Sequence, residues 1–191
     1  QVDDASSTTG NGHFLMASDG IDCGSNSIDP PPHDTSYFES QLKAVDSYYR
    51  SVSYEKFGFD LDHSTIFPLS NNEGYTLPNT MDYYNPYNQD ELQEERITEL
   101  FRDAVSIAYD SDQIEYSSYD LIVVFHAGIG QDFSLPFLDP TPEDLPSTYV
   151  DSDMILEHFG TSKLSVGNHE IEHGIILPET QNHLLYDISE D

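Results

Sequence analysis

An amphipathic helix followed by a fully apolar strand is the pattern that most restricts the fold of this chain. Over residues 90–109, apolar side chains recur every three or four residues and form one stripe, as in a helix that packs on a core. A strand is predicted over residues 119–127, because residues 121–125 form a continuous apolar run that is typical of strands covered on both faces. This succession predicts helices layered on a sheet, an α/β (α+β) architecture.

Local patterns predict three further elements. A helix is expected to begin near Asp34 or Thr35, because aromatic and aliphatic residues follow at helical spacing as far as Tyr49. A strand is expected over residues 54–70, where Phe57, Phe59 and Leu61 alternate with smaller or acidic residues. A short helix is expected over residues 152–158.

Two segments contain mainly turn-forming residues. Residues 1–33 are rich in Ser, Gly, Asn and Asp and end in three consecutive prolines, which predicts a loop or an arm. Residues 128–150 contain several glycines and prolines and are predicted to form a long loop, a feature that is often functional in compact domains.

The most suggestive motif is the run His169-Glu170-Ile171-Glu172-His173. On a helix, the two imidazoles would lie one turn apart and could both bind zinc, with Glu170 as the general base beside the metal-bound water. This interpretation predicts a zinc hydrolase, and it requires that the run is helical.

The flanking residues favour a strand for the same run. Gly167 and Asn168 precede it and Gly174 follows, while Pro178 disfavours a helix that continues. In a strand, successive side chains point to opposite faces. One face would then carry His169, Ile171, His173 and Ile175, and the other would carry Glu170, Glu172 and Gly174. We therefore predict an extended segment and keep the helical zinc site as the alternative.

The charge of the chain restricts its partners. Its 191 residues include 36 acidic and 6 basic ones, for a net charge of −30. Such a chain is not a general nucleic-acid or anionic-membrane binder, because phosphate groups would repel it, and no stretch approaches the roughly 20 apolar residues that span a bilayer. High salt, bound calcium or a solvated extracellular surface would each accommodate the charge. Cys23 is the only cysteine, so an internal disulfide is excluded.

Other candidate ligands are carboxylates and one histidine. Asp139, Glu143 and Asp144 lie in a proline-stiffened loop and form the best calcium candidate, although solvated carboxylates are the favoured interpretation. His126 follows the apolar strand, and sites in α/β sheets gather at strand ends, so it is a candidate ligand-binding residue beside the simpler role of a structural histidine. Weaker acidic groups occur at two further places: Asp110, Asp112 and Glu115, then Asp151 and Asp153.

Several segments form a recognisable set when they are taken together in chain order. They include Ile28-Asp29-Pro30-Pro31-Pro32-His33-Asp34, the helix with Leu100-Phe101-Arg102-Asp103-Ala104, the strand with Val123-Val124-Phe125-His126-Ala127-Gly128, then Asp139-Pro140-Thr141-Pro142 and Ile175-Ile176-Leu177-Pro178-Glu179-Thr180. Together they resemble the immune-inhibitor-A-like (M6) metallopeptidase domains of secreted bacterial proteins. The resemblance covers most of the chain and contains no catalytic signature.

This resemblance implies a zincin-like fold, in which helices pack on a twisted mixed sheet. It also implies secretion, calcium as a structural ion and peptide hydrolysis. Such domains usually begin with an apolar strand before the position of Gln1, and their zinc helix usually follows the strand with Pro178 and Glu179. The chain is therefore expected to be one domain fragment (residues 1–191), incomplete at both ends, with its zinc helix beyond Asp191.

Three functions remain open from the sequence. The first is a fragment of a secreted M6-like metallopeptidase domain, inactive by itself, whose partner is the remainder of its own polypeptide. The second is a non-catalytic extracellular module that binds, or assembles with other copies, and that calcium stabilises. The third is a zinc hydrolase that uses His169, Glu170 and His173 directly.

Overall fold

The computed structural model describes residues 12–16, 30–69, 74–86, 89–131 and 144–180. Helices and strands are mixed along the chain, as in an α+β protein. The described helices are α1 (Thr35–Ser53), α2 (Met81–Tyr84), α3 (Asp90–Asp112) and α4 (Ser152–Phe159), with short 3-10 turns at Leu61–His63 and Tyr116–Ser118. The described strands are β1 (Val123–Ile129), β2 (Thr148–Val150), β3 (Leu164–Val166), β4 (His169–Ile171) and β5 (Gly174–Thr180).

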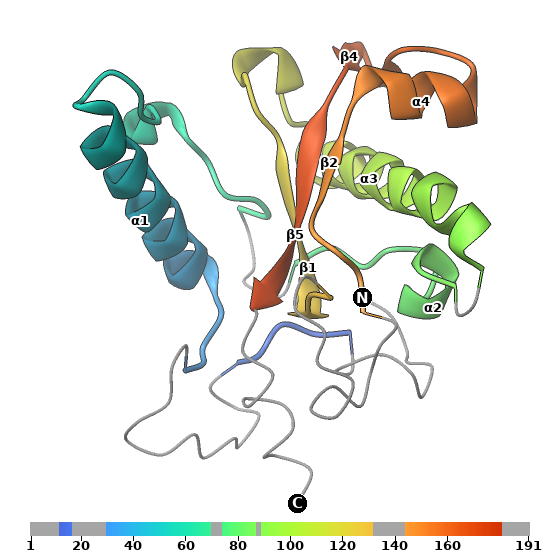
Figure 1. Cartoon of the computed structure of the whole chain (residues 1–191), viewed down its shortest axis with the longest axis horizontal. Coiled ribbons are helices and arrows are strands. Elements are labelled where there is room, and N and C mark those ends of the chain that lie inside the picture. The colour runs from blue at the N-terminus through green and yellow to red at the C-terminus, as the bar shows by residue number, and fades with distance from the viewer. Residues whose placement is uncertain (1–11, 17–29, 70–73, 87–88, 132–143, 181–191) are drawn as a thin grey trace, which may run out of the picture.

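Three strands form a mixed sheet in the order β1-β5-β2. β5 lies in the centre, parallel to β1 and antiparallel to β2, with Val124 opposite Ile176 in the first pair and Thr148 opposite Ile176 in the second. β3 and β4 form a separate antiparallel hairpin. Because β1 and β5 are parallel, their carboxyl-terminal ends lie at the same end of the sheet (Figure 1).

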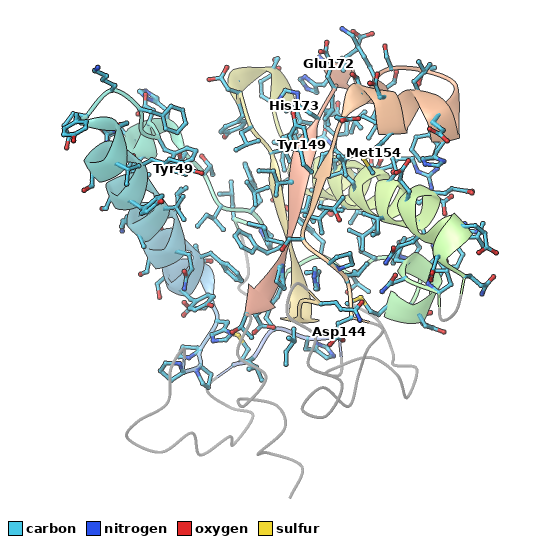
Figure 2. All side chains as sticks on the ribbon, viewed as in Figure 1. Tyr49, Asp144, Tyr149, Met154, Glu172 and His173 are labelled. Atoms are coloured by element: carbon cyan, nitrogen blue, oxygen red, sulfur yellow. The ribbon has the colours of Figure 1, made fainter. Side chains whose placement is uncertain are left out.

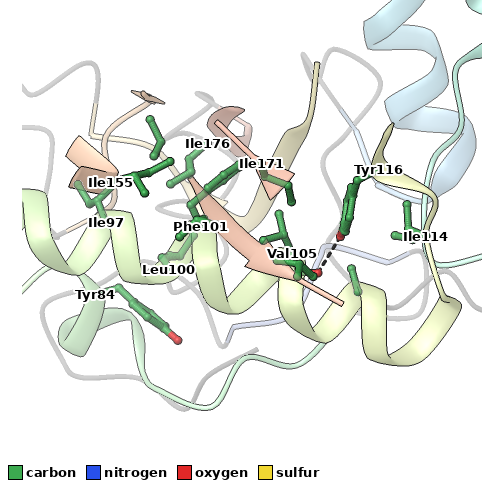
Figure 3. Packing of buried hydrophobic residues seen from close by; sticks show 14 of the residues in the cluster. Tyr84, Ile97, Leu100, Phe101, Val105, Ile114, Tyr116, Ile155, Ile171 and Ile176 are labelled. Carbon is green, nitrogen blue, oxygen red and sulfur yellow. Dashed lines mark hydrogen bonds between the residues drawn. The ribbon is translucent and has the colours of Figure 1, made fainter. Parts of the chain in front are cut away.

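The hydrophobic core lies between α3 and the sheet (Figure 3). Phe101 on α3 and Ile176 on β5 are both fully buried, and Ile155 of α4 closes the same layer. The apolar stripe of α3 therefore faces the sheet, as its periodicity predicts.

α1 lies on the other side of the sheet from α3 (Figure 1). Asp34 caps its first turn by accepting hydrogen bonds from the backbone N–H groups of Ser36 and Tyr37. Its first half contacts the sheet through Phe38, whose ring centroid lies 4.6 Å from that of Phe125. None of the helices in the described ranges combines the length and apolar character that crossing a bilayer requires.

Most predicted elements are confirmed. The helices expected near residue 35, over 90–109 and over 152–158 are α1, α3 and α4, each within a few residues of its predicted ends. The apolar strand is β1, but it begins at Val123 and lies at one edge of the described sheet, where Val123 is 39% exposed. The prediction that this strand is covered on both faces is therefore wrong for its first residue, Val123, which the described residues leave partly exposed.

The strand predicted over residues 54–70 is wrong for residues 54–69, which form turns and irregular structure. α1 ends at Ser53, and the capping residue Tyr54 has the left-handed conformation. Asp46 on this helix accepts a 2.6 Å hydrogen bond from the N–H of Phe59. Arg50 donates to Asp46 and to the carbonyl of Phe59. We call Asp46 and Arg50 the clamp. The clamp holds the segment with Phe57 and Phe59 against α1, so this segment does not pair with a strand.

The clamp predicts an acid-dependent contribution to stability. Hydrogen bonds from Arg50 and then from the Phe59 N–H lower the pKa of Asp46 below its ordinary value of 3.8. The contribution of Asp46 is therefore fully present above about pH 4 and is lost as the pH falls through the lowered pKa. We expect Asp46→Asn to be less stable than the native chain at pH 7, and the difference to shrink below pH 3.8 in urea titrations. A difference that does not change with pH would contradict the assignment.

Candidate functional site

The His169–His173 run is extended, as predicted, and the helical alternative is wrong. β4 covers His169–Ile171 and pairs with β3, with His169 opposite Val166. The connecting turn places Gly167 at φ +59°, and a Cβ there would lie 2.1 Å from the ring of Tyr109. The turn therefore requires glycine, because a side chain would be both strained and blocked.

The two histidines of this run have different surroundings. The imidazole of His169 is buried and makes T-shaped contacts with the rings of Tyr109 and Tyr116, and its Nδ1 lies 3.3 Å from a carboxylate oxygen of Glu115. The Nε2 of His173 donates to the carbonyl of Asp120 at 3.3 Å, on the side of the sheet where Tyr149 lies (Figure 2). His169 and His173 therefore do not lie on successive turns of a helix, where they could bind one metal ion together.

The carboxylates of the run face away from His169. Glu170 and Glu172 both bind Lys163, at 3.2 Å and 2.6 Å, on the exposed side of the hairpin. The predicted alternation holds through these residues and then breaks, because Gly174 is buried against Phe101 instead of lying on the exposed side. Nowhere in the described ranges do three His, Cys, Asp or Glu side chains gather as a metal site requires.

A different set of polar residues is buried at the carboxyl end of the sheet. We call it the carboxyl-end cluster, and its members are His33, His126, Asp144, Glu179 and Thr180. Parallel strands bring the ends of β1 and β5 together, and a backbone hydrogen bond joins Gly130 to Thr180. Ligand sites of α/β sheets lie at such strand ends.

Glu179 is the centre of this cluster. One carboxylate oxygen lies 2.6 Å from the backbone nitrogen of Leu15 and 2.5 Å from Nδ1 of His33, and the other accepts from the backbone N–H of Gly128 at 2.9 Å. The side chains of Glu179 and His33 are both fully buried. One carboxylate therefore joins β5 to β1, to the segment before α1 and to residues 12–16.

His33 is positioned by the start of α1. Its ring stacks on Tyr37 with 4.1 Å between centroids, and its backbone N–H donates to the carbonyl of Leu15 at 2.7 Å. The hydroxyl of Tyr37 in turn donates to the carbonyl of Glu179. His33 is thus a buried hydrogen-bonding group, although it follows three prolines in a segment predicted to be a loop or an arm.

The predicted residues His126 and Asp144 also lie at this end of the sheet. His126 is buried on β1, and its Nδ1 donates to the carbonyl of Ala127 at 2.9 Å. Asp144 is only 1% exposed, and its backbone carbonyl accepts from the side-chain amide of Asn85. The interpretation of Asp144 as a solvated carboxylate is therefore wrong. Asp139 and Glu143 lie outside the described residues.

Several of the weaker acidic candidates have structural roles. Asp151 caps α4 by accepting from the backbone N–H groups of Asp153 and Met154. Asp112 accepts a hydrogen bond from the hydroxyl of Tyr75, and burial together with this carboxylate raises the pKa of that tyrosine. Asp151 and Asp112 therefore make hydrogen bonds that stabilise the fold.

Three members of the carboxyl-end cluster, His33, Glu179 and Thr180, were not predicted as site residues. The available signal was the position of Glu179 at the end of an apolar strand, where a charged residue needs a partner if it is buried.

No family model, no curated protein and no solved structure matches this chain.

Proposed function

We propose that this chain belongs to a secreted M6-like metallopeptidase domain with a zincin-like sheet. The observation that supports the proposal most directly is the carboxyl-end cluster. Three segments that carry the resemblance, far apart in sequence, meet there and contribute His33, His126 and Glu179. A second support is β2, an antiparallel strand at one edge of the described sheet, because an extended peptide can pair with such an edge.

The described residues do not form the zinc site of such an enzyme. His169 and His173 have separate partners, and Glu170 binds Lys163 on the far side of the hairpin. The zinc ligands of the proposed enzyme therefore come from residues outside the described ones. Bound zinc would supply an activated water for attack on a peptide carbonyl, while the carboxyl-end cluster would hold the strand ends beside the site.

The test is hydrolysis of labelled casein by the complete product of the gene that encodes this chain. We expect activity that 1,10-phenanthroline abolishes and added zinc restores. The matched control is Glu170→Gln, which removes the carboxylate of the literal motif and is expected to leave the rate unchanged. If the native product is active and Glu170→Gln is inactive, catalysis is instead assigned to His169, Glu170 and His173. If the native product does not hydrolyse casein, the proposal of a peptidase is rejected.

A non-catalytic extracellular module is the second candidate. The observation that favours it is an exposed apolar face on α1, which suits a binding or assembly role. Calcium stabilisation fits both candidates, since oxygen ligands abound in a chain with 36 acidic residues.

A further inference from the structure

The second half of α1 carries an apolar face that the described residues leave about half exposed. Val45, Tyr48, Tyr49 and Val52 recur at the spacing of one helix face and are 43%, 62%, 41% and 53% exposed. We call these four residues the α1 face. Only Phe38 and Asp46 of the helix are buried. The largest apolar patch on a typical monomer covers about 300–600 Å² and is often functional, so an apolar stripe that remains in water for two helical turns is a candidate interaction surface.

This face is held in a defined shape. The ring of Tyr49 (Figure 2) contacts Phe57 and Phe59 edge-on, with centroids 5.3 Å and 6.2 Å away. The clamp formed by Asp46 and Arg50 fixes the turn that carries both phenylalanines. A face that is already ordered loses little conformational entropy when a partner covers it.

The order of residues in the face is the same in both directions. Val45, Tyr48, Tyr49 and Val52 read V-x-x-Y-Y-x-x-V, so rotation about an axis between the tyrosines exchanges Val45 with Val52 and Tyr48 with Tyr49. In an antiparallel pair about such an axis, Val45 of one copy lies opposite Val52 of the other and Tyr48 lies opposite Tyr49, so apolar side chains meet apolar side chains along the whole face. We propose that the α1 face is a homodimer interface, in which the α1 helices of two copies pack antiparallel about that axis.

The charge distribution favours this place for self-association. Residues 43–56 contain three of the six basic residues of the chain, Lys43, Arg50 and Lys56, but only two of its 36 acidic residues, Asp46 and Glu55. Elsewhere, two copies of net charge −30 meet with strong mutual repulsion. Antiparallel packing also brings Lys43 of one copy level with the Tyr54–Glu55 turn of the other, which pairs opposite charges.

The size of the face sets the strength of the dimer. From the exposed fractions of its side chains, each copy offers roughly 400 Å² of apolar surface. Two copies then bury about 800 Å² in total from this face, which is below the roughly 1,200–2,000 Å² of stable specific interfaces and typical of weak, transient association. Because the contact is apolar and the copies repel at long range, we expect dimerisation to strengthen when NaCl is raised from about 0.15 M to about 1 M.

Sedimentation equilibrium of the 191-residue chain over a wide concentration range tests the proposal. We expect a reversible dimer, which Tyr49→Glu weakens by at least about 100-fold because two charges enter one interface. The matched control is Leu156→Glu, the same kind of change at a 49% exposed position on α4, and it should leave the dissociation constant unchanged. Circular dichroism and thermal unfolding of each variant check that the fold is retained.

A charge-swap experiment tests the antiparallel register independently of Tyr49. Val45→Lys and Val52→Glu should each weaken the dimer by about 10-fold or more, since a charge then meets a valine. In the double variant, the lysine introduced in one copy lies opposite the glutamate introduced in the other. Its dissociation constant should therefore return to within about threefold of the native value. A dimer that ignores these changes overturns the proposal.

Two other results would also overturn it. A native chain that stays monomeric at every concentration and salt level has no such interface. If the complete gene product is monomeric and Tyr49 resists nitration by tetranitromethane, the face is covered within one polypeptide. The dimer stands or falls separately from peptide hydrolysis, because none of its residues belongs to the carboxyl-end cluster.

Discussion

Replacing Glu179 by alanine is expected to lower the free energy of unfolding by about 3–5 kcal/mol. The carboxylate accepts from the backbone of Leu15 and of Gly128 and lies 2.5 Å from Nδ1 of His33, and both side chains of the latter pair are fully buried. Removing it leaves three polar groups without this partner in a site from which water is excluded, and each such group carries a desolvation cost.

Urea unfolding followed by circular dichroism measures this loss, together with a fall in melting temperature of roughly 10 °C. The matched control is Glu170→Ala, which removes an exposed carboxylate paired with Lys163 and is expected to change stability by less than about 0.5 kcal/mol. A Glu179→Ala variant within about 1 kcal/mol of the native chain would show that the cluster does not hold the sheet to the start of α1.

The position of Glu179 also links stability to the proposed function. β5 ends at Thr180, directly beside this carboxylate, and the segment before α1 is joined to the same carboxylate through His33. Proteolytic loss of residues 12–16 would remove the Leu15 contact and is therefore expected to loosen the same end of β5. A site built there would depend on segments from both ends of the described sequence.

Local signals were sufficient for the three longer helices, α1, α3 and α4, whereas the four-residue helix α2 was not predicted. α1 and α4 each begin after an aspartate that caps the first turn, at Asp34 and Asp151, and α3 has an uninterrupted apolar stripe. Each of these signals acts within one or two helical turns and so can be seen in a short window of sequence. The extended conformation of the His169–His173 run followed in the same way from the glycines and the proline around it.

Long-range contacts explain what the sequence could not show. The alternation of Phe57 and Phe59 indicated a strand, but Asp46 and Arg50, on the preceding helix, bind that turn instead. His33 and Glu179 are 146 positions apart in sequence, and no local pattern around either residue predicts the contact between them. The burial of Asp144 likewise depends on segments distant in sequence, including Asn85 before α3.

Replacing Phe101 by alanine is expected to cost about 3–5 kcal/mol of stability, because this side chain is fully buried at the centre of the core. Its ring lies against the backbone at the start of β5 (Figure 3), where a Cβ on Gly174 would come within 2.3 Å of it. Gly174→Ala is therefore expected to cost about 1–3 kcal/mol by overpacking, although an alanine in a strand is otherwise harmless.

The double variant tests whether these two effects share one contact. In Phe101→Ala/Gly174→Ala, the new methyl group enters the space that the ring has left, so the total loss should be at least about 1 kcal/mol smaller than the sum of the single losses. Relief stays partial, because the same Cβ also lies 3.0 Å from the carbonyl of Ile122. The matched control is Gly160→Ala, where a Cβ meets nothing within 4 Å, and its cost should simply add to that of Phe101→Ala. Additive losses for Gly174 in urea unfolding would mean that β5 does not begin against this ring, and hence that the segment after His173 takes another course.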